Sequence, residues 1–121
     1  RLSGVFTSKN SIEMAAAVKN LKIKVGVVKR TAKELTSYEK EITTQTDKVE
    51  KMKAEDKPFH DIKQQEEVLK EAQTCLADAK RRLDGAAQDL ESLLEEEKDA
   101  LSGETEMLEE AQALVKQYVV D

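Results

Sequence analysis

The feature that most constrains this chain is a series of large apolar residues with a seven-residue period. Its members are Leu21, Val28, Leu35, Ile42 and Val49. This spacing places one apolar side chain on the same face of an α-helix every two turns, so it predicts a long amphipathic helix. The opening LKIKV also alternates like a half-buried strand, but the alternation fails where Val27 and Val28 stand side by side. The five aligned positions outweigh that short alternation.

A second series with the same period follows a break at AEDKPFHD. Pro58 lacks an N–H and has a fixed φ, so it ends one helix or opens the next, and Asp61 is placed to cap or stabilise the new N-terminus. The second series consists of Ile62, Leu69, Leu76, Leu83 and Leu90. Three residues after each come Gln65, Ala72, Ala79, Ala86 and Leu93. The alanines predict a narrow strip along which a neighbouring helix approaches closely.

A second break is expected at DALSGETE, where Gly103 would end a helix and Ser102 would cap a third one. The apolar face of that third helix would comprise Met107 or Leu108, Ala111, Leu114, Val115 and Tyr118. Short connections force neighbouring helices to run antiparallel. The sequence therefore predicts an all-α fold, an elongated antiparallel three-helix bundle with coiled-coil-like packing. Its helices would cover about residues 18–54, 59–100 and 104–119.

The first residues, 1–13, stand apart from this pattern. They are rich in Ser, Asn and other small or polar residues, lack helical periodicity, and precede Met14 and a run of alanines. We interpret them as a vector-derived leader or a flexible extension, and residues 14–121 as a single domain. Three helices can close a monomeric bundle, but such regular stripes also pair chains, so a monomer and a weak homodimer both stay open.

Side chains that carry chemistry are sparse. His60 and Cys75 are the single histidine and the single cysteine, and neither has a sequence neighbour that completes a metal or nucleophilic site. The four glycines are isolated, which argues against a phosphate-binding loop. No apolar run is long enough to span a membrane. We therefore expect no enzymatic activity, no catalytic residues, no metal, no cofactor and no membrane contact.

One charge pattern is more distinctive, because every charged residue between Val18 and Ala32 is basic. At about 100° per residue, most of these residues fall within an arc of roughly 100°. The arc contains Lys19, Lys22, Lys29 and Arg30, together with Lys33, which is the next charged residue along the chain. The arc is either a solvated helix face or a cationic surface for an acidic partner. We do not expect nucleic-acid binding, since the net charge is −5 and aromatic residues for base stacking are missing.

Five segments carry a more specific resemblance. They are KIKVGVVKR (22–30), YEKE (38–41), KVEKMKAED (48–56), DIKQQEEVL (61–69) and RRLDGAAQDL (81–90). In this order and spacing they resemble the tubulin-specific chaperone A family, also called tubulin-binding cofactor A. The resemblance covers about residues 20–99.

The resemblance implies a cytoplasmic protein of the microtubule cytoskeleton that needs no bound cofactor. Such a protein captures quasi-native β-tubulin released from chaperonin and holds it before assembly with α-tubulin. The positions that match the family, and that we expect to be exposed, are the hypothetical β-tubulin contacts. These are Lys22, Lys24, Lys29, Arg30, Glu34, Tyr38, Lys40, Lys48, Lys51, Lys63 and Gln64.

Two other classes of helical protein compete with this interpretation. A generic structural module such as a spectrin-like repeat would have no tubulin affinity, but such repeats usually carry a core Trp, which this chain lacks. A prefoldin-like subunit would need β-hairpins at the helix connection, and AEDKPFHD is too short to form them.

Overall fold

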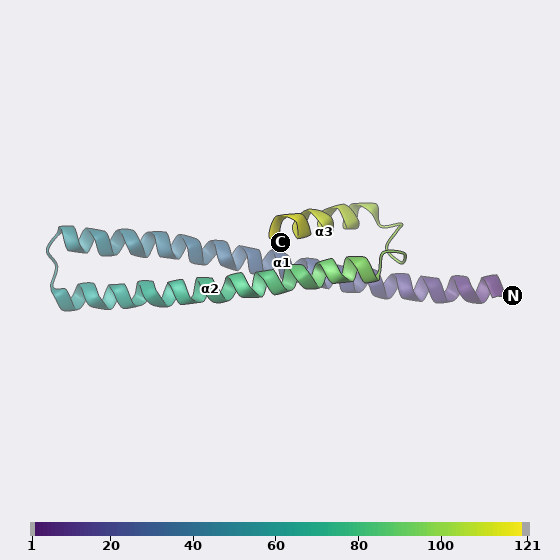
Figure 1. The fold of residues 1–121 in the computed structure, drawn as a ribbon, viewed down its shortest axis with the longest axis horizontal. Coiled ribbons are helices and arrows are strands. Elements are labelled where there is room, and N and C mark those ends of the chain that lie inside the picture. The colour runs from purple at the N-terminus through teal and green to yellow at the C-terminus, as the bar shows by residue number, and fades with distance from the viewer. Residues whose placement is uncertain (1, 120–121) are drawn as a thin grey trace. The chain divides into compact units, whose positions relative to one another are not determined.

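The computed structural model describes residues 2–119, with side chains from residue 12 onward. Three α-helices make up its regular structure: α1 (Leu2–Ala54), α2 (Phe59–Glu96) and α3 (Thr105–Tyr118) (Figure 1). The predicted all-α, three-helix fold is confirmed. By its internal contacts the chain divides into unit 1 (Arg1–Arg30 with Leu83–Asp121) and unit 2 (Thr31–Arg82).

The helix α1 begins at Leu2, well before the predicted start near residue 18. The chain has no proline before Pro58, and Gly4 is the only glycine ahead of Gly26. Good helix formers at residues 15–17 therefore extend the helix toward the N-terminus without a breaker to stop it. Apolar periodicity stops where the described side chains become exposed, at residues 12–16, and the helical backbone continues beyond that point. The side chains of residues 1–11 lie outside the described residues, and a leader at 1–13 stays a prediction.

The end of α1 is built around Asp56. The Lys57 N–H donates to the Met52 carbonyl at 3.0 Å, and the Asp56 N–H donates to the Lys53 carbonyl at 3.1 Å. Asp56 itself has a φ of 56°, in the left-handed region. These bonds are those of a Schellman motif, with aspartate at the position that glycine usually occupies.

The start of α2 lies directly after Pro58, as the sequence predicts. The Pro58 carbonyl accepts a hydrogen bond from the Ile62 N–H at 3.1 Å, which is the first bond of the helix. Asp61 lies in the first turn, where its carboxylate interacts favourably with the positive end of the helix dipole.

Unit 2 consists of a segment of α1 and a segment of α2, which lie side by side and antiparallel (Figure 1). Val49, Ala72 and Ala79 are buried in this pair, in agreement with the predicted apolar series and the alanine strip. The Gln45 amide donates to the Gln65 backbone carbonyl at 3.0 Å and to the Gln65 side-chain oxygen at 2.9 Å. A partly buried polar pair of this kind fixes the register of two helices, because any shift leaves it unpaired.

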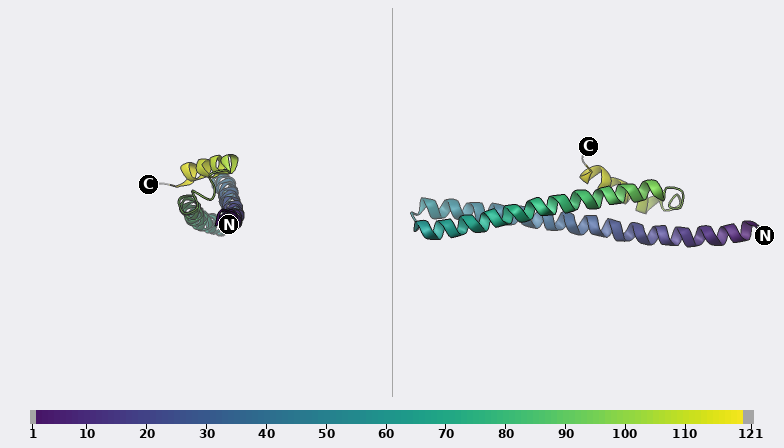
Figure 2. Two further views of the ribbon diagram at one scale, coloured as in Figure 1. Left: turned by 90° about the vertical axis from the view of Figure 1, so that its right-hand side faces the viewer. Right: turned by 60° about the horizontal axis from the view of Figure 1, so that its bottom comes forward.

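Unit 1 contains α3 together with segments of α1 and α2, and Figure 2 shows α3 lying against them. Its largest fully buried side chains are Leu21, Val28, Leu90 and Leu101. Ala111, on the face of α3 that the sequence predicted to be apolar, is also fully buried. No helix in the described part of the chain is long and apolar enough to cross a membrane.

The predicted cap of the third helix at Ser102 is wrong. Glu104 is the N-cap residue of α3, and its side chain makes no capping hydrogen bond. Ser102 instead lies in a turn in which its N–H donates to the Asp99 carbonyl at 3.4 Å, and the Glu104 N–H donates to the Leu101 carbonyl at 2.9 Å. Leu101 is fully buried, so its packing fixes these turns and delays the start of α3 until the chain has passed Gly103.

Candidate partner-binding surface

The basic residues of α1 in unit 1 form one exposed surface. Leu21 and Val28 are buried and therefore fix the rotation of α1 about its axis. Basic residues on the neighbouring arc of the helix consequently project into solvent. We call them the basic face; its members are Lys19, Lys22, Lys29 and Arg30, all exposed.

Most of the charge on the basic face is not neutralised by the side chains that the structure describes. The Lys29 ammonium lies 2.5 Å from the Glu110 carboxylate of α3, and both side chains are about half exposed (55 % and 50 %). Among the residues that the structure describes, no ion pair involves Lys19, Lys22 or Arg30. An exposed pair such as Lys29–Glu110 contributes at most about 1 kcal/mol, so Glu110 holds the Lys29 ammonium only weakly.

Two open grooves adjoin the basic face. The first has a volume of about 340 Å³ and is lined by Lys22, Val25, Gly26, Lys29, Met107 and Glu110. The second has a volume of about 590 Å³ and is lined by Met14, Ala15, Val18, Lys19, Lys22, Ile23 and Glu104. Lys22 borders both, so cationic and apolar surface meet at this residue. The arrangement suits a partner segment that carries both acidic and apolar side chains.

Gly26 also belongs to this surface, although the sequence analysis did not include it among the candidate contact residues. It lies in the middle of α1, where glycine costs about 1 kcal/mol relative to alanine. At about 100° per residue it falls inside the arc of the basic residues. A glycine within a helical period, surrounded by like-charged residues, is the signal that could have identified it from the sequence.

The second basic cluster in the sequence, at Lys80, Arg81 and Arg82, is largely paired inside unit 2. Arg82 binds both carboxylate oxygens of Glu34, and Arg81 forms an ion pair with Asp78 one turn away. The hydrogen bonds from Arg82 lower the pKa of the Glu34 carboxyl, with a smaller contribution from the Tyr38 hydroxyl. This cluster is therefore less available to a partner than the basic face.

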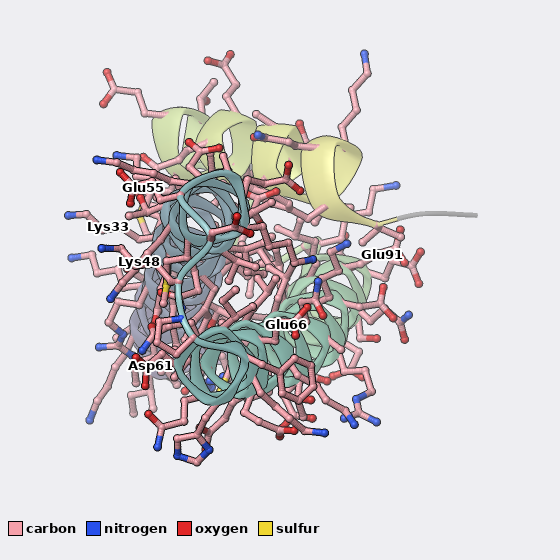
Figure 3. All side chains as sticks on the ribbon, turned by 90° about the vertical axis from the view of Figure 1, so that its left-hand side faces the viewer. Lys33, Lys48, Glu55, Asp61, Glu66 and Glu91 are labelled. Atoms are coloured by element: carbon pink, nitrogen blue, oxygen red, sulfur yellow. The ribbon has the colours of Figure 1, made fainter. Side chains whose placement is uncertain are left out.

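The predicted contact residues are divided between the two units. Lys22, Lys24, Lys29 and Arg30 belong to unit 1, and Lys24 is half-buried rather than exposed. The remainder belong to unit 2, where Glu34 and Tyr38 are half-buried. The exposed members of unit 2 are Lys40, Lys48, Lys51, Lys63 and Gln64. Figure 3 shows Lys33 and Lys48 reaching outward from α1.

The residues considered for catalysis or metal binding belong to unit 2. His60 is exposed in the first turn of α2, and Cys75 is a half-buried free thiol in the same helix. In the part of the chain that the structure describes, no three metal-ligating side chains gather into a site.

Comparison with known proteins places these features in a family. A family model described as tubulin binding cofactor A matches residues 16–115. The chain belongs to the tubulin binding cofactor A family. The segments that resembled this family in the sequence therefore identified it correctly. Relatives in this family are named as tubulin-specific chaperones or tubulin-folding cofactors.

Individual members of the tubulin binding cofactor A family are similar along most of the chain. Human tubulin-specific chaperone A is 51 % identical over 82 residues, which are 68 % of this chain and 76 % of the human protein. The crystal structure of tubulin folding cofactor A from Arabidopsis thaliana has a TM-score of 0.76 at 36 % identity, covering 86 % of this chain and 96 % of that one. The human tubulin chaperone cofactor A structure has a TM-score of 0.70 at 44 % identity, covering 84 % and 96 %.

Proposed function

We propose that this chain captures quasi-native β-tubulin in the cytoplasm and holds it until it assembles with α-tubulin. The observation that carries the proposal is the basic face of α1, with three exposed cations that have no ion pair among the described residues. The tubulin-specific names of its relatives supply the class of partner.

The charge distribution explains why a local surface is needed. This chain has a net charge of −5, and tubulin is acidic as well, so the two proteins as wholes repel each other. A cationic face on one helix supplies the local attraction that raises the association rate. Since the face is exposed and polar, the bound β-tubulin is also released readily, as a holding chaperone requires.

Gel filtration tests the proposal directly. This protein is mixed with β-tubulin freshly released from chaperonin, in the presence of α-tubulin, at micromolar concentrations. We expect β-tubulin to comigrate with it at roughly the summed mass, and α-tubulin to elute separately. If a chain that circular dichroism shows to be helical produces no shift, the alternative of a structural helical module without tubulin affinity is favoured. The same column, run with the chain alone, distinguishes a monomer from a weak homodimer.

A further inference from the structure

Gly26 lies at a position where the fold itself does not require glycine. Its φ is not positive, so an L-residue adopts the same backbone conformation without strain. Beyond the adjacent backbone of α1 itself, a Cβ atom built at Gly26 would meet no described atom within 4 Å. Alanine would therefore fit, and it would favour the helix. Neither backbone conformation nor packing against the described residues accounts for this glycine.

The neighbours of Gly26 on the helix surface are exposed, and three of the four are basic. Residues three and four positions away are its surface neighbours, and these are Lys22, Ile23, Lys29 and Arg30. All four are exposed, and Ile23 keeps 54 % of its surface in contact with solvent. We call the surface of α1 at Gly26, between these four side chains, the Gly26 notch. Because Gly26 has no side chain, the main chain of a partner can approach α1 more closely here than at the neighbouring turns.

The residues of α3 that border the Gly26 notch indicate which kind of partner group would bind there. The 340 Å³ groove runs from Gly26 to Met107 and Glu110. Glu110 already places a carboxylate 2.5 Å from the Lys29 ammonium. Lys22 and Arg30 flank the same glycine and have no such partner among the described residues. The notch therefore has cationic positions for carboxylates on both sides of the close-approach point.

We propose that an acidic segment of the partner lies across α1 with its main chain seated on Gly26. Its carboxylates pair with Lys22, Lys29 and Arg30, and an apolar side chain packs against Ile23. The proposal rests on the proposed function, because the segment then belongs to β-tubulin. An acidic polypeptide fits better than nucleic acid, because the notch has no aromatic side chain for stacking and the chain is acidic overall.

The variant Gly26→Ala separates binding from stability, because it should change them in opposite directions. The added methyl group favours the helix and should raise Tm by roughly 2 to 6 °C. The same methyl group keeps the partner's main chain away from α1, so we expect β-tubulin capture to weaken about fivefold or more. Capture equal to that of the unmodified chain would overturn the proposal.

The chain offers a matched control in Gly85→Ala. Gly85 also lies inside a helix, in unit 1, and a Cβ atom there likewise meets nothing within 4 Å. This variant should raise Tm similarly and leave capture unchanged. An equal loss of capture in both variants would show that helix stiffening, and not the notch, weakens binding, and would contradict the proposal.

Poly-L-glutamate keeps the test independent of the proposed function. Fluorescence anisotropy of labelled poly-L-glutamate should report binding to the unmodified chain and to Gly85→Ala, and weaker binding to Gly26→Ala. If β-tubulin is not captured by any version but this difference persists, the proposed function fails and the notch stands. Equal binding of poly-L-glutamate by all three, or a preference for single-stranded oligo(dT), would overturn the acidic-segment proposal.

Discussion

The guanidinium of Arg82 on α2 binds both carboxylate oxygens of Glu34 on α1, at nitrogen–oxygen distances of 3.1 and 3.0 Å. Both residues belong to unit 2, and their side chains are half exposed. Bidentate pairing combines charge with a fixed geometry, so it orients the two helices more strictly than a lysine pair would. The pair also ties the stability of unit 2 to pH.

The direction of that pH dependence follows from the pKa of Glu34. Hydrogen bonds from Arg82 lower this pKa below the ordinary value of 4.5 in the folded state. The pair therefore stabilises the fold above about pH 4.5, and its contribution is lost as the pH falls through the lower, folded-state value. We expect Glu34→Gln to flatten the decline of Tm in melts recorded between pH 7 and pH 2.5.

The matched control for this variant is Glu39→Gln, which removes an exposed carboxylate of the same helix. Glu39 has no ion pair among the described residues. Its substitution should leave the slope of Tm against pH close to that of the unmodified chain. A Glu34→Gln slope that matches the unmodified chain would mean that the pair does not persist in solution.

Asp56 supports a second prediction, because two substitutions there should act in opposite directions. Glycine adopts the left-handed conformation at the end of α1 without strain, so Asp56→Gly should raise the free energy of unfolding by about 0.5 kcal/mol. Alanine lacks the local hydrogen bonding that helps aspartate in this conformation, so Asp56→Ala should lower it by about 1 kcal/mol. Urea denaturation followed by circular dichroism measures both. Changes of the same sign would contradict the Schellman assignment at the end of α1.

Charge reversal tests the basic face as a whole. The triple variant Lys22→Glu, Lys29→Glu, Arg30→Glu should weaken β-tubulin capture at least tenfold without changing helicity, because all three side chains are exposed. Gel filtration and circular dichroism give the two readouts. The control is Lys70→Glu, Lys80→Glu, Lys116→Glu, which makes the same change in net charge at exposed positions elsewhere. Equal losses in both variants would reduce the effect to overall charge repulsion.

Glu110→Gln provides the converse test, since it should strengthen binding. The substitution frees Lys29 from its ion pair with α3 while preserving the size and shape of the side chain. We expect the association rate with β-tubulin to rise about two- to fivefold at low salt, with the gain disappearing at high salt. Stopped-flow measurements at two ionic strengths check this, and Tm should change little because the pair is exposed. A slower association would show that Glu110 itself contacts the partner.

The helical core could be predicted from the sequence because burial follows a fixed period. Every member of the two heptad series, from Leu21 to Val49 and from Ile62 to Leu90, is buried or half-buried. Pro58 similarly marked the first connection, since its backbone chemistry is local. The start of α1 was not predicted because it depends on the absence of a helix breaker and not on apolar periodicity. The N-cap at Glu104 was not predicted because it depends on the burial of Leu101.

The candidate site was only partly predictable for a related reason. The cationic arc of α1 follows from residue spacing on one helix, and its unit 1 members are exposed as expected. Pairs between helices, such as Arg82–Glu34 and Lys29–Glu110, depend on the register of two helices, which spacing along one helix does not determine. The sequence alone did not identify Gly26, because its importance depends on the open space around it in the structure.

The presence of α3 in unit 1 and not in unit 2 has a mechanical consequence. Two helices enclose an apolar row from one side only, and Leu35, Ile42, Leu69 and Leu76 accordingly stay half-buried. A segment with so few buried contacts opens and recloses at a lower free energy than a fully packed one. We therefore expect the parts of α1 and α2 in unit 2 to deform more easily than the parts in unit 1. As a result, we expect a partner bound on the basic face to meet a preformed geometry, and a partner bound on unit 2 to change the shape of the surface that it binds.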